Sequence, residues 1–235
     1  AVSLAQREGA DLKLIEKKSF PTPRTPDETI SNLLKLMDEL LTTNQFTGLA
    51  AIGISCGGPL DSKKGLILSP PNLPGWDGIE IIKPFREKYG VPVGLENDAN
   101  AGALAEWQYG AGRGVENLIF LTFGTGMGAG LILNGALYRG TNDLAGEVGH
   151  IRLAESGPVG YGKAGSFEGF CSGGGIARFA RELTAAALKK GTTPLFCPTA
   201  SKLETITAKT VGEAARQGDP LAIEIYRRVG VRLGQ

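Results

Sequence analysis

Histidine and cysteine are scarce in this chain of 235 residues, and neither sign of charge is in excess. It has one histidine and three cysteines, and its 25 basic residues nearly balance its 24 acidic ones, which gives a formal net charge of +1. A near-neutral chain has no strong field for nucleic acid or an anionic membrane, so neither is expected as a partner. Cys56, Cys171 and Cys197 are far apart and odd in number, which predicts free thiols in a reducing cytoplasm.

Long apolar runs are absent as well, because no stretch of about 18 apolar residues occurs, so no transmembrane span is expected. No signal peptide is expected either, since the first residues lead directly into a strand-like pattern. The sequence therefore predicts a cytoplasmic protein. Hydrophobic residues make up 42% and charged residues 21%, an ordinary globular profile. The 35 glycines cluster at the ends of expected strands, a pattern typical of backbone that approaches a ligand.

Apolar periodicity predicts an α/β chain in which strands and helices alternate. Strands are expected over residues 2–5, 11–20, 48–56, 91–96, 118–122, 128–133 and 136–139. Helices are expected over residues 27–41, 79–89 with a bend at Pro84, 101–107, 172–190, 211–216 and 220–233. The pair Asn134-Gly135 indicates a hairpin turn. A domain junction is expected near residue 104, between a small N-terminal domain, residues 1–103, and a larger one, residues 104–235.

The most informative segment is Glu96-Asn97-Asp98-Ala99-Asn100, where an expected strand meets an expected helix. Polar side chains at such a corner lie at the carboxyl end of a sheet, where α/β folds bind ligands. The amide of Asn97 can bind a hydroxyl group from two sides, and the carboxylate of Asp98 can accept its proton. The alternative interpretation is that these side chains only cap the helix.

A glycine-rich segment, Phe123-Gly124-Thr125-Gly126-Met127-Gly128-Ala129-Gly130, links two expected strands. Alternating glycines let backbone N–H groups converge on an oxyanion, and the Thr125 hydroxyl adds a donor. The segment lacks the Lys-Ser/Thr ending of a P-loop and leads into a strand, so neither the P-loop nor the Rossmann fingerprint fits. It is interpreted either as a phosphate cradle or as a glycine-rich hairpin without a ligand.

Further polar candidates follow and precede this segment. Glu147 and His150 are three residues apart, and Glu168 precedes a glycine turn that opens a helix. A single histidine is more often structural than functional, and two ligands make a poor metal site.

The segments Gly57-Gly58-Pro59 and Asn72-Leu73-Pro74-Gly75-Trp76 would share a rim with the Asn97 corner if the first sheet is doubly wound. Their groups suit a polyhydroxylated ligand, although the tryptophan is equally interpreted as a buried loop anchor.

Taken together, these motifs resemble the ROK family of bacterial sugar kinases and repressors over almost the whole chain. The segments that carry the resemblance are residues 53–61, 72–76, 96–100, 124–126 and 147–150. The resemblance implies the actin-like ATPase fold, with two ribonuclease-H-like domains and mixed sheets. It further implies a glucokinase-like enzyme that phosphorylates a hexose or N-acetylhexosamine with ATP and Mg²⁺, as a homodimer. A sugar-responsive transcriptional regulator and a non-catalytic sugar-binding protein are the alternatives.

The resemblance also implies a role for each candidate residue. Asp98 is the expected general base, which takes the proton of the attacking sugar hydroxyl. The residues expected to bind the sugar are Gly58, Asn72, Asn97, Glu147, His150 and Glu168. The residues expected to form the phosphate loop for ATP are Gly124, Thr125 and Gly126.

The chain departs from the family pattern in three places. Members usually have three zinc-binding cysteines between the positions of His150 and Glu168, whereas residues 157–165 contain none. We therefore expect no zinc, which leaves His150 for sugar contact alone. The family's Asp-x-Gly-Gly-Thr loop is expected before Ala1, and further strands and an adenosine-binding segment after Gln235. The sequence is thus expected to be a fragment of a longer protein.

Overall fold

The structure is a computed structural model that describes residues 1–235, and the chain forms two compact units. Unit 1 consists of Ala1–Phe120 and Gly130–Gly146, and unit 2 consists of Leu121–Ala129 and Glu147–Gln235. The predicted junction near residue 104 lies inside the helix α3 (Asp98–Tyr109), within unit 1. The division into domains of residues 1–103 and 104–235 stays a prediction.

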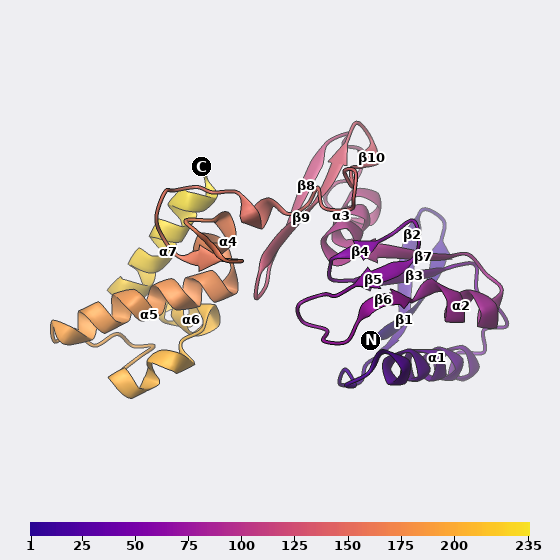
Figure 1. The fold of residues 1–235 in the computed structure, drawn as a ribbon, viewed down its shortest axis with the longest axis horizontal. Coiled ribbons are helices and arrows are strands. Elements are labelled where there is room, and N and C mark those ends of the chain that lie inside the picture. The colour runs from indigo at the N-terminus through magenta and orange to yellow at the C-terminus, as the bar shows by residue number, and fades with distance from the viewer. The chain divides into compact units, whose positions relative to one another are not determined.

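Unit 1 combines antiparallel and parallel strand pairs (Figure 1). Its antiparallel strands are β1 (Val2–Glu8) with β2 (Asp11–Lys18), and β4 (Leu60–Asp61) with β5 (Leu66–Leu68) and β6 (Asp77–Glu80). Its parallel pair is β3 (Ile52–Cys56) with β7 (Val93–Asn97). Strands β4 and β5 were not predicted, because strands of two and three residues show too little alternation to be recognised.

Helix α1 (Pro26–Thr43) covers the apolar side of unit 1. It begins after Thr25, whose hydroxyl accepts the N–H of Glu28, and proline occupies its first turn. Its buried side chains include Met37 and Leu40. The core that Met37 joins contains Leu60, Ile67, Trp76, Ile81, Ile82, Phe85 and Leu95.

The predicted helix over residues 79–89 is wrong in its first part. Strand β6 occupies Asp77–Glu80, and helix α2 spans only Ile82–Tyr89. Pro84 lies in the first turn of α2, where a backbone N–H has no partner within the helix, so the proline requires no bend. The remaining expected helices and strands are present, with ends that differ by a few residues.

A three-stranded sheet carries residues of both units. It consists of β8 (Leu118–Phe123), β9 (Met127–Leu133) and β10 (Ala136–Leu137), with β9 in the middle. Asn134 and Gly135 join β9 to β10 at φ values of 53° and 70°. Both residues therefore have the left-handed backbone conformation of a two-residue hairpin turn, and the predicted turn is confirmed.

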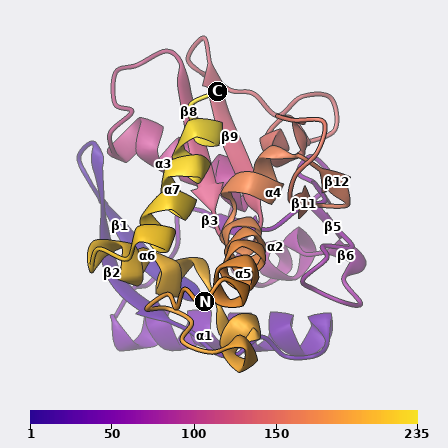
Figure 2. The ribbon, with the colours of Figure 1, turned by 90° about the vertical axis from the view of Figure 1, so that its left-hand side faces the viewer.

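Unit 2 is mainly helical. Its elements are the 3₁₀ helix η1 (Val148–His150), the hairpin β11 (Val159–Gly160) and β12 (Lys163–Ala164), and the helices α4 (Phe167–Cys171), α5 (Gly173–Lys189), α6 (Ala208–Arg216) and α7 (Pro220–Leu233), with the 3₁₀ helix η2 (Ala200–Thr205) before α6. Helices α5 and α7 lie beside each other (Figure 2). Ile176, Val211 and Ile225 are buried in the core that these helices share.

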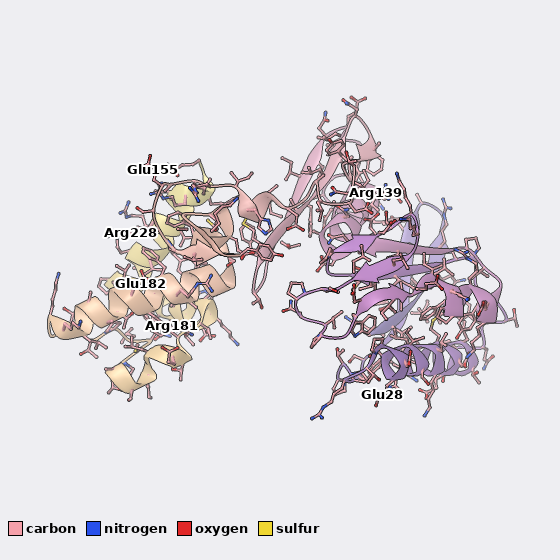
Figure 3. The ribbon with its side chains drawn as sticks, in the orientation of Figure 1. Glu28, Arg139, Glu155, Arg181, Glu182 and Arg228 are labelled. Atoms are coloured by element: carbon pink, nitrogen blue, oxygen red, sulfur yellow. The ribbon has the colours of Figure 1, made fainter.

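The connection before α6 is fastened to α5 by one arginine. Arg181, which is labelled in Figure 3, donates hydrogen bonds to the carbonyl oxygens of Leu203, Glu204 and Ile206, at 3.1, 3.0 and 3.3 Å. Three backbone acceptors on one guanidinium hold the irregular segment against the helix. No helix of either unit has both the length and the hydropathy that a membrane span requires.

Candidate active site

Strands β3 and β7 end at the same edge of unit 1 because they are parallel. Cys56 is in register with Asn97, the last residue of β7. A Cβ atom added to Gly58, just beyond β3, would lie 3.5 Å from Nδ2 of Asn97. The expected proximity of Gly58 to the Asn97 corner is therefore observed, at the carboxyl edge where α/β sheets bind ligands.

The side-chain oxygen of Asn97 caps helix α3, and its side-chain nitrogen is free. Its Oδ1 accepts the backbone N–H groups of Ala99 and Asn100, at 2.9 and 3.3 Å. Its Nδ2 forms no hydrogen bond within the chain and faces the backbone of Gly58. The capping interpretation thus describes the oxygen, while the amide N–H₂ stays available as a hydrogen-bond donor to a ligand.

Asp98 is the first residue of α3, and its side chain is exposed. Oδ1 accepts the N–H of Ala99 at 2.9 Å, whereas Oδ2 forms no hydrogen bond. Its charge acts on Cys56: burial raises the pKa of that thiol, and the negative charge of Asp98 raises it further. Asp98 therefore lies at the end of β3 as well as β7, with one carboxylate oxygen able to accept a proton.

Glu96 and Arg139 support this corner, and neither was a candidate from the sequence. Oε1 of Glu96 accepts the N–H of Asn97 at 3.0 Å and the side-chain amide of the buried Asn100 at 2.9 Å. Oε2 accepts Nε of Arg139 at 2.8 Å. No local pattern could have revealed the arginine, because it lies 43 residues further along the chain.

Asn72 and Trp76 lie on the loop between β5 and β6. Asn72 is exposed, and its side chain forms no hydrogen bond, so none joins it to the Asn97 corner. Trp76 is 5% exposed and packs in the core of unit 1, which supports its interpretation as a loop anchor. The same loop is fastened by the hydrogen bond from the Ser69 N–H to the Trp76 carbonyl, at 2.8 Å.

In unit 2, the glycine-rich loop between β8 and β9 is attached to the start of α5. The carbonyl of Gly124 accepts the N–H of Gly173 at 2.8 Å, and a Cβ at Gly174 would lie 2.8 Å from the carbonyl oxygen of Thr125. The N–H groups of Thr125 and Gly126 and the Thr125 hydroxyl form no hydrogen bonds within the chain. Free donors beside the N-terminus of a 17-residue helix suit an anionic ligand.

Glu147, His150 and Glu168 lie on two neighbouring elements of unit 2. Nε2 of His150 lies 3.6 Å from Oε2 of Glu147. A Cβ at Gly149, within η1, would lie 3.2 Å from Cβ of Glu168 on α4. The His150 ring stacks on Tyr161, with centroids 4.3 Å apart and an angle of 16° between the ring planes. Sequence reasoning missed Tyr161, which the β11–β12 turn places at a positive φ of 46°.

The residues around His150 do not fit a zinc site. Zinc requires about four nitrogen, sulfur or oxygen ligands in tetrahedral geometry, and no group of three or more His, Cys, Asp or Glu side chains converges anywhere in the chain. The segment after His150 is instead held by hydrogen bonds, among them the one from Nζ of Lys163 to the His150 carbonyl at 2.8 Å. That the chain binds no zinc stays a prediction.

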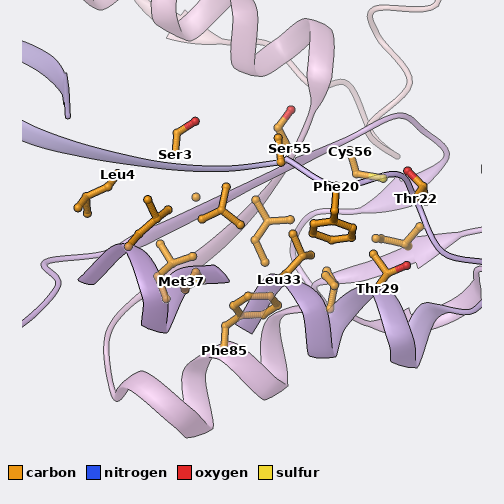
Figure 4. A pocket seen from close by; sticks show the side chains of 18 of the residues that line it. Ser3, Leu4, Phe20, Thr22, Thr29, Leu33, Met37, Ser55, Cys56 and Phe85 are labelled. Carbon is orange, nitrogen blue, oxygen red and sulfur yellow. The ribbon is translucent and has the colours of Figure 1, made fainter. Parts of the chain in front are cut away.

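A cavity of about 460 Å³ in unit 1 is separate from these groups (Figure 4). It lies between α1 and the strands β1 and β3, and apolar side chains such as Leu33, Met37 and Phe85 line it. None of the candidate site residues is among its lining residues. The cavity is therefore part of the core of unit 1, and none of the polar candidates lines it.

Comparison with solved structures identifies the class of protein. A ROK family glucokinase from Streptomyces griseus, in complex with glucose and AMPPNP, has a TM-score of 0.72 and 31% identity, covering 94% of this chain and 70% of that one. A ROK family transcriptional regulator, a homologue of the MLC protein of E. coli, has a TM-score of 0.74 and 26% identity, covering 95% of this chain and 54% of that one. The chain therefore has the actin-like ATPase fold found in ROK sugar kinases.

Sequence comparison then gives the family. The model of the ROK family matches residues 5–235. The glucokinase of Streptomyces coelicolor is 30% identical over 230 residues, which are 97% of this chain and 70% of that protein. The chain belongs to the ROK family.

Proposed function

We propose that this chain transfers the γ-phosphoryl group of ATP to a hydroxyl of a hexose or N-acetylhexosamine. One observation carries the proposal: Asp98, exposed at the carboxyl edge of a parallel strand pair, has one carboxylate oxygen free of hydrogen bonds. The loop with free donors beside α5 adds a place for phosphate, and glucokinase relatives at about a third identity supply the reaction class. We also propose that the protein is a cytoplasmic homodimer.

In this proposal the candidate residues position the sugar and the phosphates of ATP. Phosphoryl transfer depends mainly on positioning and on neutralising the charge of the phosphates. Oδ2 of Asp98 takes the proton of the sugar hydroxyl as its oxygen bonds to the γ-phosphorus and the bond to the β-phosphate oxygen breaks. Nδ2 of Asn97 donates to a sugar hydroxyl beside Gly58. Glu147, His150 and Glu168 bind further hydroxyl groups, as Asn72 does from its loop.

The phosphate side of the reaction belongs to Thr125 and Gly126. Their N–H groups and the threonine hydroxyl donate to the phosphate oxygens of ATP, and the N-terminus of α5 favours the negative charge there. Bound Mg²⁺ supplies further charge neutralisation on the same phosphates. Gly124 contributes by attaching the loop to α5, because its carbonyl accepts the N–H of Gly173.

The test of the proposal is Asp98→Asn, with turnover and sugar binding measured separately. Loss of a general base should lower turnover by about 10²–10⁴-fold. Sugar affinity should be retained, because the amide of Asn97 and the hydroxyl ligands are unchanged. Asp77→Asn, at an exposed aspartate that forms no hydrogen bond, is the matched control. Turnover of Asp98→Asn within tenfold of the wild type would show that Asp98 is not the base.

Sugar binding is measured first by thermal melting against glucose, fructose, mannose, N-acetylglucosamine and N-acetylmannosamine. A sugar that raises the melting temperature identifies the preferred substrate, since a ligand that binds only the folded state stabilises it. A cooperative transition that none of these sugars moves would contradict a hexose site.

A sugar-responsive transcriptional regulator is the second candidate. The similarity to the ROK family regulator, with its TM-score of 0.74, favours it. A regulator or a non-catalytic sugar-binding protein predicts sugar affinity without ATP turnover, whereas the kinase predicts both. Measuring ATP hydrolysis or sugar phosphate formation in the presence of the bound sugar separates these candidates.

A further inference from the structure

One carboxylate in unit 2 contacts the phosphate loop directly. Oε2 of Glu168 accepts the backbone N–H of Met127 at 3.1 Å. Met127 directly follows Gly126 and opens strand β9, and its side chain is buried in the core. A Cβ at Gly126 would lie 2.8 Å from the same oxygen, so any side chain there would displace the carboxylate. The glycine and the carboxylate thus occupy adjoining space at the end of the loop.

The backbone of Glu168 is fixed on both sides. Ser166, which is fully buried, caps α4 by accepting the N–H of Gly169 at 3.0 Å. The carbonyl of Glu168 accepts the N–H of Ser172, the cap residue of α5, at 3.0 Å. The side chain of Glu168 therefore extends toward the loop from a rigid junction between two helices.

The glycine-rich loop is consequently held at both of its ends. At one end the Gly124 carbonyl accepts the N–H of Gly173, and at the other end Met127 donates to Glu168. The residues between these two attachments, Thr125 and Gly126, carry the free donors. The position of those donors depends on both attachments.

The other oxygen of the Glu168 carboxylate, Oε1, accepts no hydrogen bond within the chain. A carboxylate with one bound oxygen can rotate and lose its contact with Met127. A donor on Oε1 would oppose that rotation, because both oxygens would then be engaged. A sugar hydroxyl is such a donor.

Building on the function proposed above, we propose that Glu168 is a positioning residue that couples sugar binding to nucleotide binding. A sugar hydroxyl on Oε1 fixes Oε2 on the Met127 N–H, and the fixed loop presents the donors of Thr125 and Gly126 to phosphate. The conformational cost of ordering the loop falls on sugar binding, so the nucleotide binds to a loop that is already ordered. By linkage, the nucleotide strengthens sugar binding by the same factor.

The experiment measures AMPPNP affinity by calorimetry, with Mg²⁺, in the absence and presence of glucose or of the panel sugar that stabilises the chain most. In the wild type the sugar should tighten AMPPNP binding about 5-fold or more, the lower end of typical couplings. Glu168→Ala should abolish this factor. It should also weaken AMPPNP binding without sugar, because the loop has lost one attachment.

Glu168→Gln tests the mechanism, since its amide oxygen can still accept the Met127 N–H. Its AMPPNP affinity without sugar should be close to that of the wild type. Glu155→Gln, at an exposed glutamate that forms no hydrogen bond (Figure 3), is the control and should leave every constant unchanged. The ¹H–¹⁵N resonance of Met127 provides a direct readout, which should shift in Glu168→Ala without any ligand and shift in the wild type when sugar is added.

The outcomes separate the coupling from the proposed function. If neither sugar nor AMPPNP binds the wild type, the proposed function fails and the coupling fails with it. If both bind, but sugar leaves AMPPNP affinity and the Met127 resonance unchanged, the coupling alone is overturned. A Glu168→Ala variant with lower sugar affinity and unaltered AMPPNP affinity without sugar would also overturn it, because Glu168 would then be a sugar ligand only.

Discussion

Arg139 and Glu96 form an ion pair in which Nε and Nη2 of the arginine lie 2.8 and 2.7 Å from one oxygen, Oε2, of the carboxylate. The Glu96 side chain is only 14% exposed. Its other oxygen accepts the N–H of Asn97, so the arginine indirectly fixes the strand end from which Asn97 and Asp98 extend. A second link, from the N–H and hydroxyl of Ser62 to the carboxylate of Asp143, holds the same segment of unit 1 that follows β10.

Arg139→Met should destabilise unit 1 because it leaves a mostly buried carboxylate without its cation. We expect the free energy of unfolding to fall by about 1–2 kcal/mol, more than for an exposed pair. Denaturant unfolding measures the change, and the double variant with Glu96→Gln gives the coupling energy. Arg24→Met, at an exposed arginine without a hydrogen bond, is the control. A coupling energy near zero would mean that the ion pair does not support the corner.

Thr184→Val should stabilise unit 2. The Thr184 side chain is fully buried in α5, and its hydroxyl oxygen has no hydrogen-bond partner. Replacing the hydroxyl by a methyl group of similar size removes the cost of an unsatisfied buried polar atom, about 1 kcal/mol or more. The melting temperature measures this change, and Thr42→Val on the exposed surface of α1 should leave it unaltered. A lower melting temperature for Thr184→Val would show that the hydroxyl has a partner in solution.

Asp98→Asn should make Cys56 react faster with iodoacetamide at pH 8. The thiolate is the reactive form, and the charge of Asp98 is the second cause, after burial, that raises the pKa of Cys56. Removing that charge lowers the pKa and increases the thiolate fraction at this pH. Cys171 serves as the internal reference, because burial raises its pKa to about 11. Labelling is followed by mass spectrometry, and an unchanged Cys56 rate would place Asp98 further from the end of β3.

Tyr161→Asn should loosen the segment around His150. The substitution removes the stacked ring, while asparagine tolerates the positive φ of this position. A stacked aromatic pair contributes about 0.5–1.5 kcal/mol. We therefore expect the free energy of unfolding to fall by an amount in this range and the sugar affinity to be weaker. Tyr161→Phe keeps the ring and should behave as the wild type.

Treatment with a chelator tests the prediction that the chain binds no zinc. A chelator such as 1,10-phenanthroline should leave the melting temperature unchanged, because the His150 segment is held by side-chain stacking and hydrogen bonds. One zinc ion per chain in elemental analysis would contradict the prediction, as would destabilisation by the chelator.

The long elements of the fold could be predicted from the sequence because their periodicity is local. Helix α1 and the Asn134-Gly135 turn follow from apolar spacing and turn chemistry alone. Strand β6 and helix α2 were merged into one helix, since Ile79, Ile81 and Ile82 are compatible with either period. Strands β4 and β5 are too short to show a period at all.

The candidate site, like the fold, could be predicted only in part from the sequence. The polar corner at Asn97 and Asp98 follows from its neighbours in sequence, but capping and ligand binding were alternatives there. The division of the Asn97 amide between a capping oxygen and a free N–H₂ group came from the structure. The supports of the site do not follow, because Arg139 and Glu96, or Glu168 and Met127, are more than 40 residues apart in sequence. Only packing of distant elements brings such pairs together. Sequence patterns therefore reveal the candidate site residues more readily than the residues that hold them in place.

The division of the chain has a consequence for engineering. The chain passes from one unit to the other three times, after Phe120, Ala129 and Gly146. A truncation after Gly146 therefore keeps all of unit 1 but retains residues 121–129 of unit 2, and a chain that starts at Glu147 lacks those residues. A gene for unit 2 alone would have to fuse residues 121–129 to residue 147 through a new linker, and a gene for unit 1 would have to bridge residues 120 and 130.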